Sequence, residues 1–294
     1  MESARGLLMD ALEWQRITRD LVIEASTTYR PDQVNAYRKA LAATPEGPGR
    51  WVLEQLLANA AAAERERRPL CDDTGIPHLL LELGADCAFD SSHLGAVLEG
   101  VREGLNALPG RAMAVSGGAR QRVEQSDGLS EDPADVIPPS VVLKPISGPQ
   151  SRLTVLMLGG GPEIRSRTYR VFHERSLAKV LKEAASWAVE AASLLGCTPS
   201  VLAIGIGRTH YEATTLTLEA MAHGDLDSQD DWEHFVTDEV NRRGCGPLGL
   251  GDGPTVLGTF IRIGPQRASG VRIVCLRPGC CMDPRLSTSG CSRS

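Results

Sequence analysis

Residues 68–77, with the sequence RPLCDDTGIP, decide how the rest of the chain is organised. A helical pattern runs into this stretch, and its first proline ends that pattern. The apolar run 78–83 that follows (HLLLEL) is typical of a buried strand. Cys71 and Asp73 therefore lie on a loop between two regular elements, where catalytic side chains are often held. Ordinary roles also fit: a buried thiol at Cys71, a turn cap at Asp72 and a solvated acid at Asp73.

The composition indicates a folded protein with an acidic balance of charge. The 294 residues are 42% hydrophobic and 23% charged, which suits one large or two medium domains with a real core. The net charge of -6 argues against nucleic-acid binding, because phosphate contacts need a basic face. No apolar run reaches the length of a membrane span, and the first residues lack the apolar segment of a signal peptide. We expect a cytoplasmic protein with no membrane contact, whose eight cysteines are thiols or metal ligands.

Helical and strand-like segments alternate along the chain. Apolar periodicity predicts helices over 7–27, 30–43, 51–67, 91–107, 175–195, 209–223 and 229–243. Short apolar runs predict strands over 78–83, 140–144, 152–158, 201–207, 256–263 and 271–275. This interleaving predicts an α/β (mixed α+β) fold in a single domain over 1–294, with a helical layer over 1–68 and an α/β part over 69–294.

Three segments carry loop signals. Residues 116–139 are rich in Gly, Ser, Asp and Pro, and we expect a long loop there. The three glycines at 159–161 follow a strand and allow backbone N–H groups to approach an anion. They do not form the dinucleotide-binding fingerprint, because the helix and spacing that it requires are not expected here. Residues 249–255 form a second glycine-rich loop.

The cysteines at three separated turns suggest a metal centre. No Cys-x-x-Cys pair occurs, which argues against a zinc finger. Cys71, Cys197 and the pair Cys280 and Cys281 each lie on a turn bounded by Gly or Pro at the end of an element. Three thiolates from separate loops can hold an iron–sulfur cluster and leave one iron open to substrate. Such an iron acts as a Lewis acid in hydration chemistry.

Several of these stretches, in this order, resemble motifs of the class I fumarate hydratase / L(+)-tartrate dehydratase family, specifically its α-subunit. The sequence Cys-Asp-Asp-Thr-Gly at 71–75 resembles that family's Cys-Gln-Asp-Thr-Gly. Further resemblances cover most of the chain. The arginine-containing loop at 111–115 and the triple glycine at 159–161 are similar to stretches of the family, and Arg285 follows the Cys280–Cys281 pair as an arginine follows the family's third cysteine ligand. Cys-Thr-Pro at 197–199 with the glycine-rich segment up to 209 resembles the family's Cys-Pro-Pro segment, and Gly-Pro-Leu-Gly-Leu-Gly at 246–251 resembles its Gly-Pro-Gln-Gly-Leu-Gly.

The resemblance implies a hydro-lyase that adds or removes water on a small hydroxy-dicarboxylate, such as tartrate or malate/fumarate. It implies a 4Fe-4S cluster with one open iron, held by Cys71, Cys197 and either Cys280 or Cys281. The spacing to Arg285 favours Cys281 as the third ligand, whereas the preceding glycine favours Cys280.

The resemblance also implies the substrate contacts. Asp73 matches the acid/base residue that takes a proton from the carbon beside a carboxylate. Arg111 matches a clamp for a substrate carboxylate, which the planar guanidinium suits. Gly160 and Gly161 match positions whose backbone N–H groups contact the substrate.

Three positions depart from the family pattern. Asp72 and Leu248 each stand where the family has Gln, and Arg267 lies where it has His. Asp72 brings a second negative charge close to an anionic substrate. Arg267 is a permanent cation, which suits an additional carboxylate or phosphonate-like group better than proton transfer. The departures predict that this chain takes a specialised substrate.

Two-subunit members of the family carry a separate β-subunit that completes the site. We therefore expect a β-subunit partner in an α2β2 or similar assembly. Two alternatives are a scaffold that binds the β-subunit without catalysis and an anion-binding protein that uses its glycine loops without metal. Turnover that is lost in Asp73→Asn excludes the scaffold, and iron in an oxygen-free preparation excludes the metal-free protein.

Overall fold

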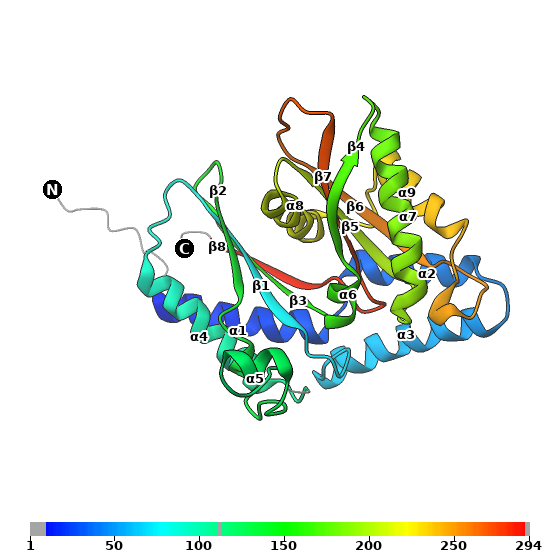
Figure 1. The fold of residues 1–294 in the computed structure, drawn as a ribbon. Helices are drawn as coiled ribbons and strands as arrows, with labels where there is room; N and C mark the ends of the chain where they lie inside the picture. Colours follow the sequence, from blue (N-terminus) through cyan, green and yellow to red (C-terminus); the bar gives the residue numbers. More distant parts are fainter. Residues whose placement is uncertain (1–9, 111–112, 292–294) are drawn as a thin grey trace. The chain divides into compact units, whose positions relative to one another are not determined.

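The structure is a computed structural model that describes residues 10–110 and 113–291. The chain divides into two compact units, each with a four-stranded mixed sheet (Figure 1). Unit 1 is drawn from residues 1–28, 63–158 and 285–294, and unit 2 from 29–62 and 159–284. The expected mixed α/β class is confirmed. A single domain over 1–294, divided at position 68, stays a prediction.

Unit 1 is a sheet with helices on one face. Its strands are β1 (Ile76–Leu83), β2 (Ser140–Pro145), β3 (Ser151–Leu158) and β8 (Arg285–Cys291), in the order β2-β1-β3-β8. Strand β1 runs parallel to β2 and antiparallel to β3, which pairs antiparallel with β8. Helices α1 (Ala11–Thr27) and α4 (Ser91–Ala107) bury Trp14 and Leu105 against Leu79 and Leu153.

The segment 116–139 contains more regular structure than expected. It includes the short helix α5 (Ala119–Glu124) and the 3-10 turn η1 (Pro133–Val136). Asp132 caps η1 through a bond from the Ala134 N–H to its carboxylate, and Pro133 occupies the first helical position. No side chain of α5 is buried, so the helix leaves no apolar periodicity in the sequence.

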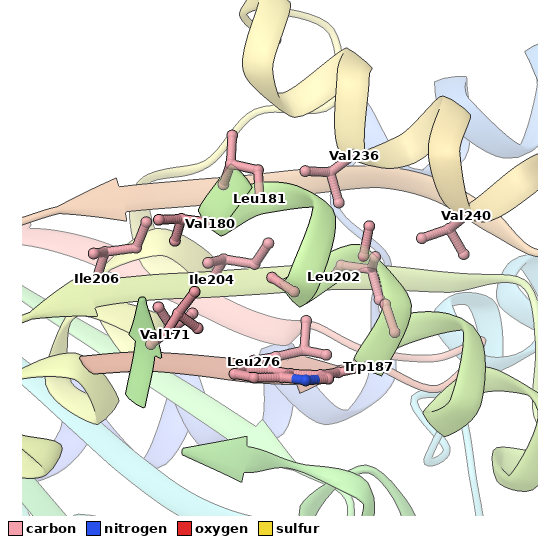
Figure 2. Packing of buried hydrophobic residues seen from close by; sticks show 14 of the residues in the cluster. Val171, Val180, Leu181, Trp187, Leu202, Ile204, Ile206, Val236, Val240 and Leu276 are labelled. Atoms are coloured by element: carbon pink, nitrogen blue, oxygen red, sulfur yellow. The ribbon is translucent and has the colours of Figure 1, made fainter. Parts of the chain in front are cut away.

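Unit 2 has helices on both faces of its sheet. Its strands are β4 (Arg167–Phe172), β5 (Ser200–Gly207), β6 (Val256–Ile263) and β7 (Val271–Pro278), in the order β4-β7-β5-β6. Figure 2 shows the core in which Leu181 of α7 (Leu177–Leu195), Val236 of α9 (Asp231–Asn241) and Ile204 of β5 belong to one buried cluster. Helix α9 packs against α7 and β6. Helix α8 (His210–His223) packs against Gly205, where an added Cβ would lie 2.0 Å from the carbonyl oxygen of Ala213.

Three further elements of the described chain belong to unit 2, and one helix is shared by both units. They are α2 (Pro31–Ala43), α6 (Gly160–Arg165) and η2 (Pro247–Gly249), while α3 (Pro48–Glu66) continues across the boundary into unit 1. Helix α6 was not expected, because it begins in glycines, which are poor helix formers. Strands β4 and β8 were not expected either, since both are edge strands with many polar residues. No helix in the described part of the chain has the length and apolar character needed to span a membrane.

Candidate functional site

The loop that carries Cys71 is held by hydrogen bonds to its own carboxylates. The Asp72 carboxylate accepts the N–H of Asp73 at 3.0 Å and the thiol of Cys71 at 3.6 Å. The Asp73 carboxylate accepts the N–H of Gly75 at 2.9 Å, a turn typical of aspartate. Leu70 is buried and its N–H donates to the carbonyl oxygen of Ser26 at 2.9 Å, which anchors the loop to the end of α1.

Arg285 supports the same loop from β8. Its side chain is buried, and Nη1 donates to the carbonyl oxygens of Asp73 at 2.7 Å and Thr74 at 3.2 Å. Gly75 makes room for it: the residue has φ +84°, and an added Cβ would lie 2.6 Å from Arg285 Nη2. Arg285, which follows the Cys280–Cys281 pair in the sequence, therefore fixes the backbone of the acid/base candidate.

Cys197 and Cys280 lie on neighbouring turns of unit 2. Cys197 precedes β5 and Cys280 follows β7, and the antiparallel register Leu202↔Pro278 brings these strand ends together. The N–H of Cys281 donates to the carbonyl oxygen of Cys197 at 2.7 Å. Burial, and then the nearby Cys280 thiol, raise the pKa of the Cys197 thiol. Two of the predicted thiols are thus brought together by the pairing of β5 and β7.

The two adjacent cysteines differ in environment. Cys281 is buried, whereas Cys280 is half-buried. The Cys280 sulfur accepts the N–H of Met282 at 3.4 Å. The Cys280 turn closes on itself, since the N–H of Asp283 donates to the Cys280 carbonyl oxygen at 3.0 Å. Cys280 therefore presents a partly accessible sulfur with a backbone donor.

Two buried tyrosines anchor the turn that carries Cys280 and Cys281. The hydroxyls of Tyr29 and Tyr37 donate to the carbonyl oxygen of Cys281 at 2.8 and 2.6 Å. Their rings are stacked, with centroids 5.7 Å apart and an interplanar angle of 10°. Burial is the main cause that raises the pKa of Tyr29 and of Tyr37 well above the usual value for tyrosine, and the nearby cysteines raise it further. Both hydroxyls therefore stay protonated. Gln33 adds donors to the carbonyl oxygens of Met282 and Asp283.

Arg277 joins the cysteine turn to the triple glycine. It is buried, and Nη1 lies 3.1 Å from the buried Asp283 carboxylate. Nη2 donates to the carbonyl oxygen of Gly159 at 3.2 Å, and Nε lies 3.4 Å from the exposed Glu163 carboxylate. Sequence reasoning missed Arg277, although an arginine at the end of the apolar run 273–276, with Asp283 and Pro284 a few residues later, was a usable signal.

Of the other predicted residues, Gly160 and Gly161 lie on a helix and Arg267 lies on a turn of unit 2. Gly160 and Gly161 open α6 after Gly159. Arg267 is exposed on the turn between β6 and β7, and the length of β7, roughly 25 Å at the usual rise per residue, separates it from Cys280. Arg111 lies outside the described residues.

Leu248, one of the departures from the family pattern, lies next to the second cysteine. Its N–H donates to the carbonyl oxygen of Thr198 at 3.1 Å, and the Thr198 hydroxyl donates to the carbonyl oxygen of Gly246 at 2.6 Å. The glycine-rich turn at 246–251 is therefore docked on the Cys197 turn. The leucine side chain is exposed there, so the position is open to whatever binds beside Cys197.

The donor set fits an iron–sulfur cluster in chemical type. No three His, Cys, Asp or Glu side chains within residues 10–110 and 113–291 gather as ligands of one metal ion. The candidate thiols are divided between the units, with Cys71 in unit 1 and Cys197 and Cys280 in unit 2. Thiolates are the ligands that iron–sulfur clusters use, and backbone N–H bonds to such sulfurs are common tuning elements. The paired thiols of unit 2 and the N–H bond to Cys280 agree with that chemistry.

Comparison with known proteins defines the class as a hydro-lyase. The model of the fumarate hydratase (Fumerase) family matches residues 15–288, a range that includes every candidate site residue. The chain belongs to this family, and the expected activity, addition or removal of water on a hydroxy-dicarboxylate, is confirmed at that level. The chain is also 25% identical over 260 residues to a provisionally named L(+)-tartrate dehydratase subunit alpha of Methanocaldococcus jannaschii. That match covers 83% of this chain and 87% of the relative.

Proposed function

We propose that the chain is the α-subunit of an iron–sulfur hydro-lyase, with Cys71, Cys197 and Cys280 as ligands of a 4Fe-4S cluster that has one open iron. The observation that carries the proposal is the junction of the second and third cysteine turns, where the Cys281 N–H donates to the Cys197 carbonyl oxygen. When bound, such a cluster supplies a Lewis-acidic iron that assists departure of a hydroxyl group.

Cys280 is preferred to Cys281 as the third ligand. The Cys280 sulfur is partly accessible and accepts a backbone N–H, whereas the Cys281 side chain is buried. After burial, the nearby Cys280 thiol is the second cause that raises the pKa of the Cys197 thiol, and an effect of this kind requires the two sulfurs to lie close together. Serine at position 280 should remove iron from the purified protein, and serine at position 281 should leave most of it.

Asp73 is the proposed acid/base residue. Its backbone carbonyl is fixed by Arg285 and its carboxylate by the Gly75 N–H, so the side chain has a defined direction before substrate arrives. In water removal it would take the proton from the carbon beside the substrate carboxylate. Asp72 adds a negative charge close to it, and this charge should select against substrates with a carboxylate at that position.

Anion recognition is assigned to backbone and arginine groups. Gly160 and Gly161 supply N–H groups at the start of α6 as proposed substrate contacts. Arg111 remains the proposed carboxylate clamp. Arg267 remains a prediction, and its place at the opposite end of β7 from Cys280 gives no support to a role beside that thiol.

A β-subunit is the proposed partner, in an α2β2 assembly. The support is the name of the Methanocaldococcus jannaschii relative, which is that of a subunit alpha. The cytoplasm is the proposed compartment, because thiols that are to ligate iron persist in a reducing environment. Co-expression with a candidate β-subunit and measurement of the complex by size-exclusion chromatography with light scattering tests the assembly.

The decisive experiment is metal and sulfide analysis of the full chain purified without oxygen, combined with electron paramagnetic resonance spectroscopy. We expect about four irons per chain, as a 4Fe-4S cluster requires, and their loss in Cys71→Ser. Turnover of tartrate or malate by the complex should be lost in Asp73→Asn and decline in air. A folded chain without iron would overturn the proposal.

A further inference from the structure

The peptide group between Cys281 and Met282 is hydrogen-bonded at both ends in an unusual way. Its carbonyl oxygen accepts the hydroxyls of Tyr29 and Tyr37, at 2.8 and 2.6 Å. Its N–H, which belongs to Met282 and points the opposite way in the amide plane, donates to the sulfur of Cys280 at 3.4 Å. Two phenols are thus connected to one thiol through a single peptide group.

Both phenol bonds are built into the core of unit 2. Tyr37 is fully buried and Tyr29 nearly so, and the stacked rings leave the hydroxyls side by side. Tyr29 also lies 2.8 Å from the sulfur of Met282, but a thioether is a weaker acceptor than a carbonyl oxygen. Each phenol has one proton, so each can supply one hydrogen bond at a time to the Cys281 carbonyl oxygen, and a carbonyl oxygen has two lone pairs to accept them.

Hydrogen bonds in series strengthen one another. A carbonyl that accepts two donors is more polarised, and its amide N–H becomes a better donor. Hydrogen bonds to cluster sulfurs are among the features that set the reduction potential of an iron–sulfur cluster. They stabilise negative charge on the sulfur, which favours the more reduced form and raises the potential.

We propose that Tyr29 and Tyr37 are positioning residues that act through the 281–282 peptide on the Cys280 thiolate and raise the reduction potential of the cluster. The inference rests on the proposed function, because it takes Cys280 as a cluster ligand. It assigns to two buried tyrosines, which lie more than 240 residues from Cys280 in the sequence, control over the electronic state of the metal centre.

Three variants and a matched control test the relay. Tyr29→Phe, Tyr37→Phe and the double variant each remove hydroxyls and keep the stacked rings. Gln33→Leu is the control, since Gln33 donates to the carbonyl oxygens of Met282 and Asp283 and not to that of Cys281. It loosens the same turn without touching the peptide that bonds to Cys280.

The measurement is iron content together with the reduction potential, from a redox titration of the full chain followed by electron paramagnetic resonance. We expect retained iron and a shift of the potential to more negative values, largest in Tyr29→Phe/Tyr37→Phe and absent in Gln33→Leu. Retained iron with an unshifted potential in the double variant overturns the relay alone. An equal shift in Gln33→Leu also overturns it. Wild-type protein without iron overturns the proposed function, and the relay with it.

A second measurement keeps both hydroxyls and so avoids variants that fail to fold. The chain has four tyrosines, and Tyr169 and Tyr211 are exposed. In a Tyr169→Phe/Tyr211→Phe background, growth on 3-fluorotyrosine labels only the buried pair. Fluorination makes a phenol a stronger donor, so the potential should shift to more positive values, opposite to the phenylalanine variants. No shift, or a shift of the other sign, contradicts the relay.

Discussion

Replacement of Arg277 by methionine should remove a large part of the stability of unit 2. Arg277 and Asp283 are 4% and 1% exposed, and their side chains lie 3.1 Å apart. The variant leaves the Asp283 carboxylate buried without this cation. Breaking a buried pair by removal of one partner costs about 3–5 kcal/mol. The contact to Glu163 adds at most about 1 kcal/mol, because that carboxylate is exposed.

The free energy of unfolding can be followed in urea by tryptophan fluorescence and circular dichroism. Three of the four tryptophans, Trp51, Trp187 and Trp232, belong to unit 2, and Trp187 lies in its core, so most of the fluorescence signal reports the unfolding of this unit. A loss of about 3–5 kcal/mol is a large fraction of the roughly 5–15 kcal/mol that folded proteins typically have. We expect a marked decrease in the urea midpoint of the transition that the fluorescence reports.

Two control variants separate the buried pair from its neighbours. Glu163→Gln should change the free energy of unfolding by less than about 1 kcal/mol. Arg277→Met/Asp283→Leu should recover much of the loss, since the double variant removes the buried carboxylate together with the buried cation. A cost below about 1 kcal/mol for Arg277→Met, or no recovery in the double variant, would refute the reasoning.

The remaining predictions concern the Cys71 loop and one helix cap. Gly148→Ala should cost about 1–3 kcal/mol from its positive φ and leave activity intact, because open space surrounds the added Cβ. Gly75→Ala, at a similar φ, should cost more and lower activity, because its Cβ would displace Arg285; thermal unfolding and turnover measure both variants. Asp72→Gln should lower KM for a dicarboxylate about fivefold, the effect of roughly 1 kcal/mol of charge repulsion, and an unchanged KM would place Asp72 away from the substrate. The Ser92 hydroxyl first, and then the other groups at the α4 cap, lower the pKa of Asp90, so its contribution to stability is fully present above the ordinary carboxyl range and is lost as the pH falls. Melting temperatures between about pH 2 and pH 7 should therefore differ most between wild type and Asp90→Asn at the upper end, and a constant difference would contradict this origin.

The sequence predicted the regular elements well where their apolar pattern was strong. Helix α4 and strand β6 have the predicted bounds, 91–107 and 256–263. Strand β8 was missed because its inward positions include Arg285 and Ser287, whose polar groups are satisfied by partners from the Asp73 loop and from Glu24. Such pairings cannot be predicted without the fold, because the partners lie far apart in the sequence and leave no local pattern.

Candidate ligands could be predicted from the sequence, whereas the residues that hold their loops could not. Cys71 and Cys197 were identified from their turns and from the family resemblance. The sequence leaves Cys280 and Cys281 equivalent as candidates, and only the structure shows that they differ in burial and in the Met282 bond on which our proposal of Cys280 rests. Tyr37 could not be found from sequence, since it lies at a helical position that an ordinary core tyrosine would occupy equally well.

The passage of the chain between the two units constrains how its gene can change. Unit 1 is completed by segments from both ends of the sequence, and unit 2 by segments on either side of residues 63–158. A recombination breakpoint anywhere between residues 29 and 284 separates pieces of unit 1, so neither unit can be exchanged as a cassette between genes. Substitution in place, at single positions such as Asp72 and Leu248, is a route to change that leaves both units whole.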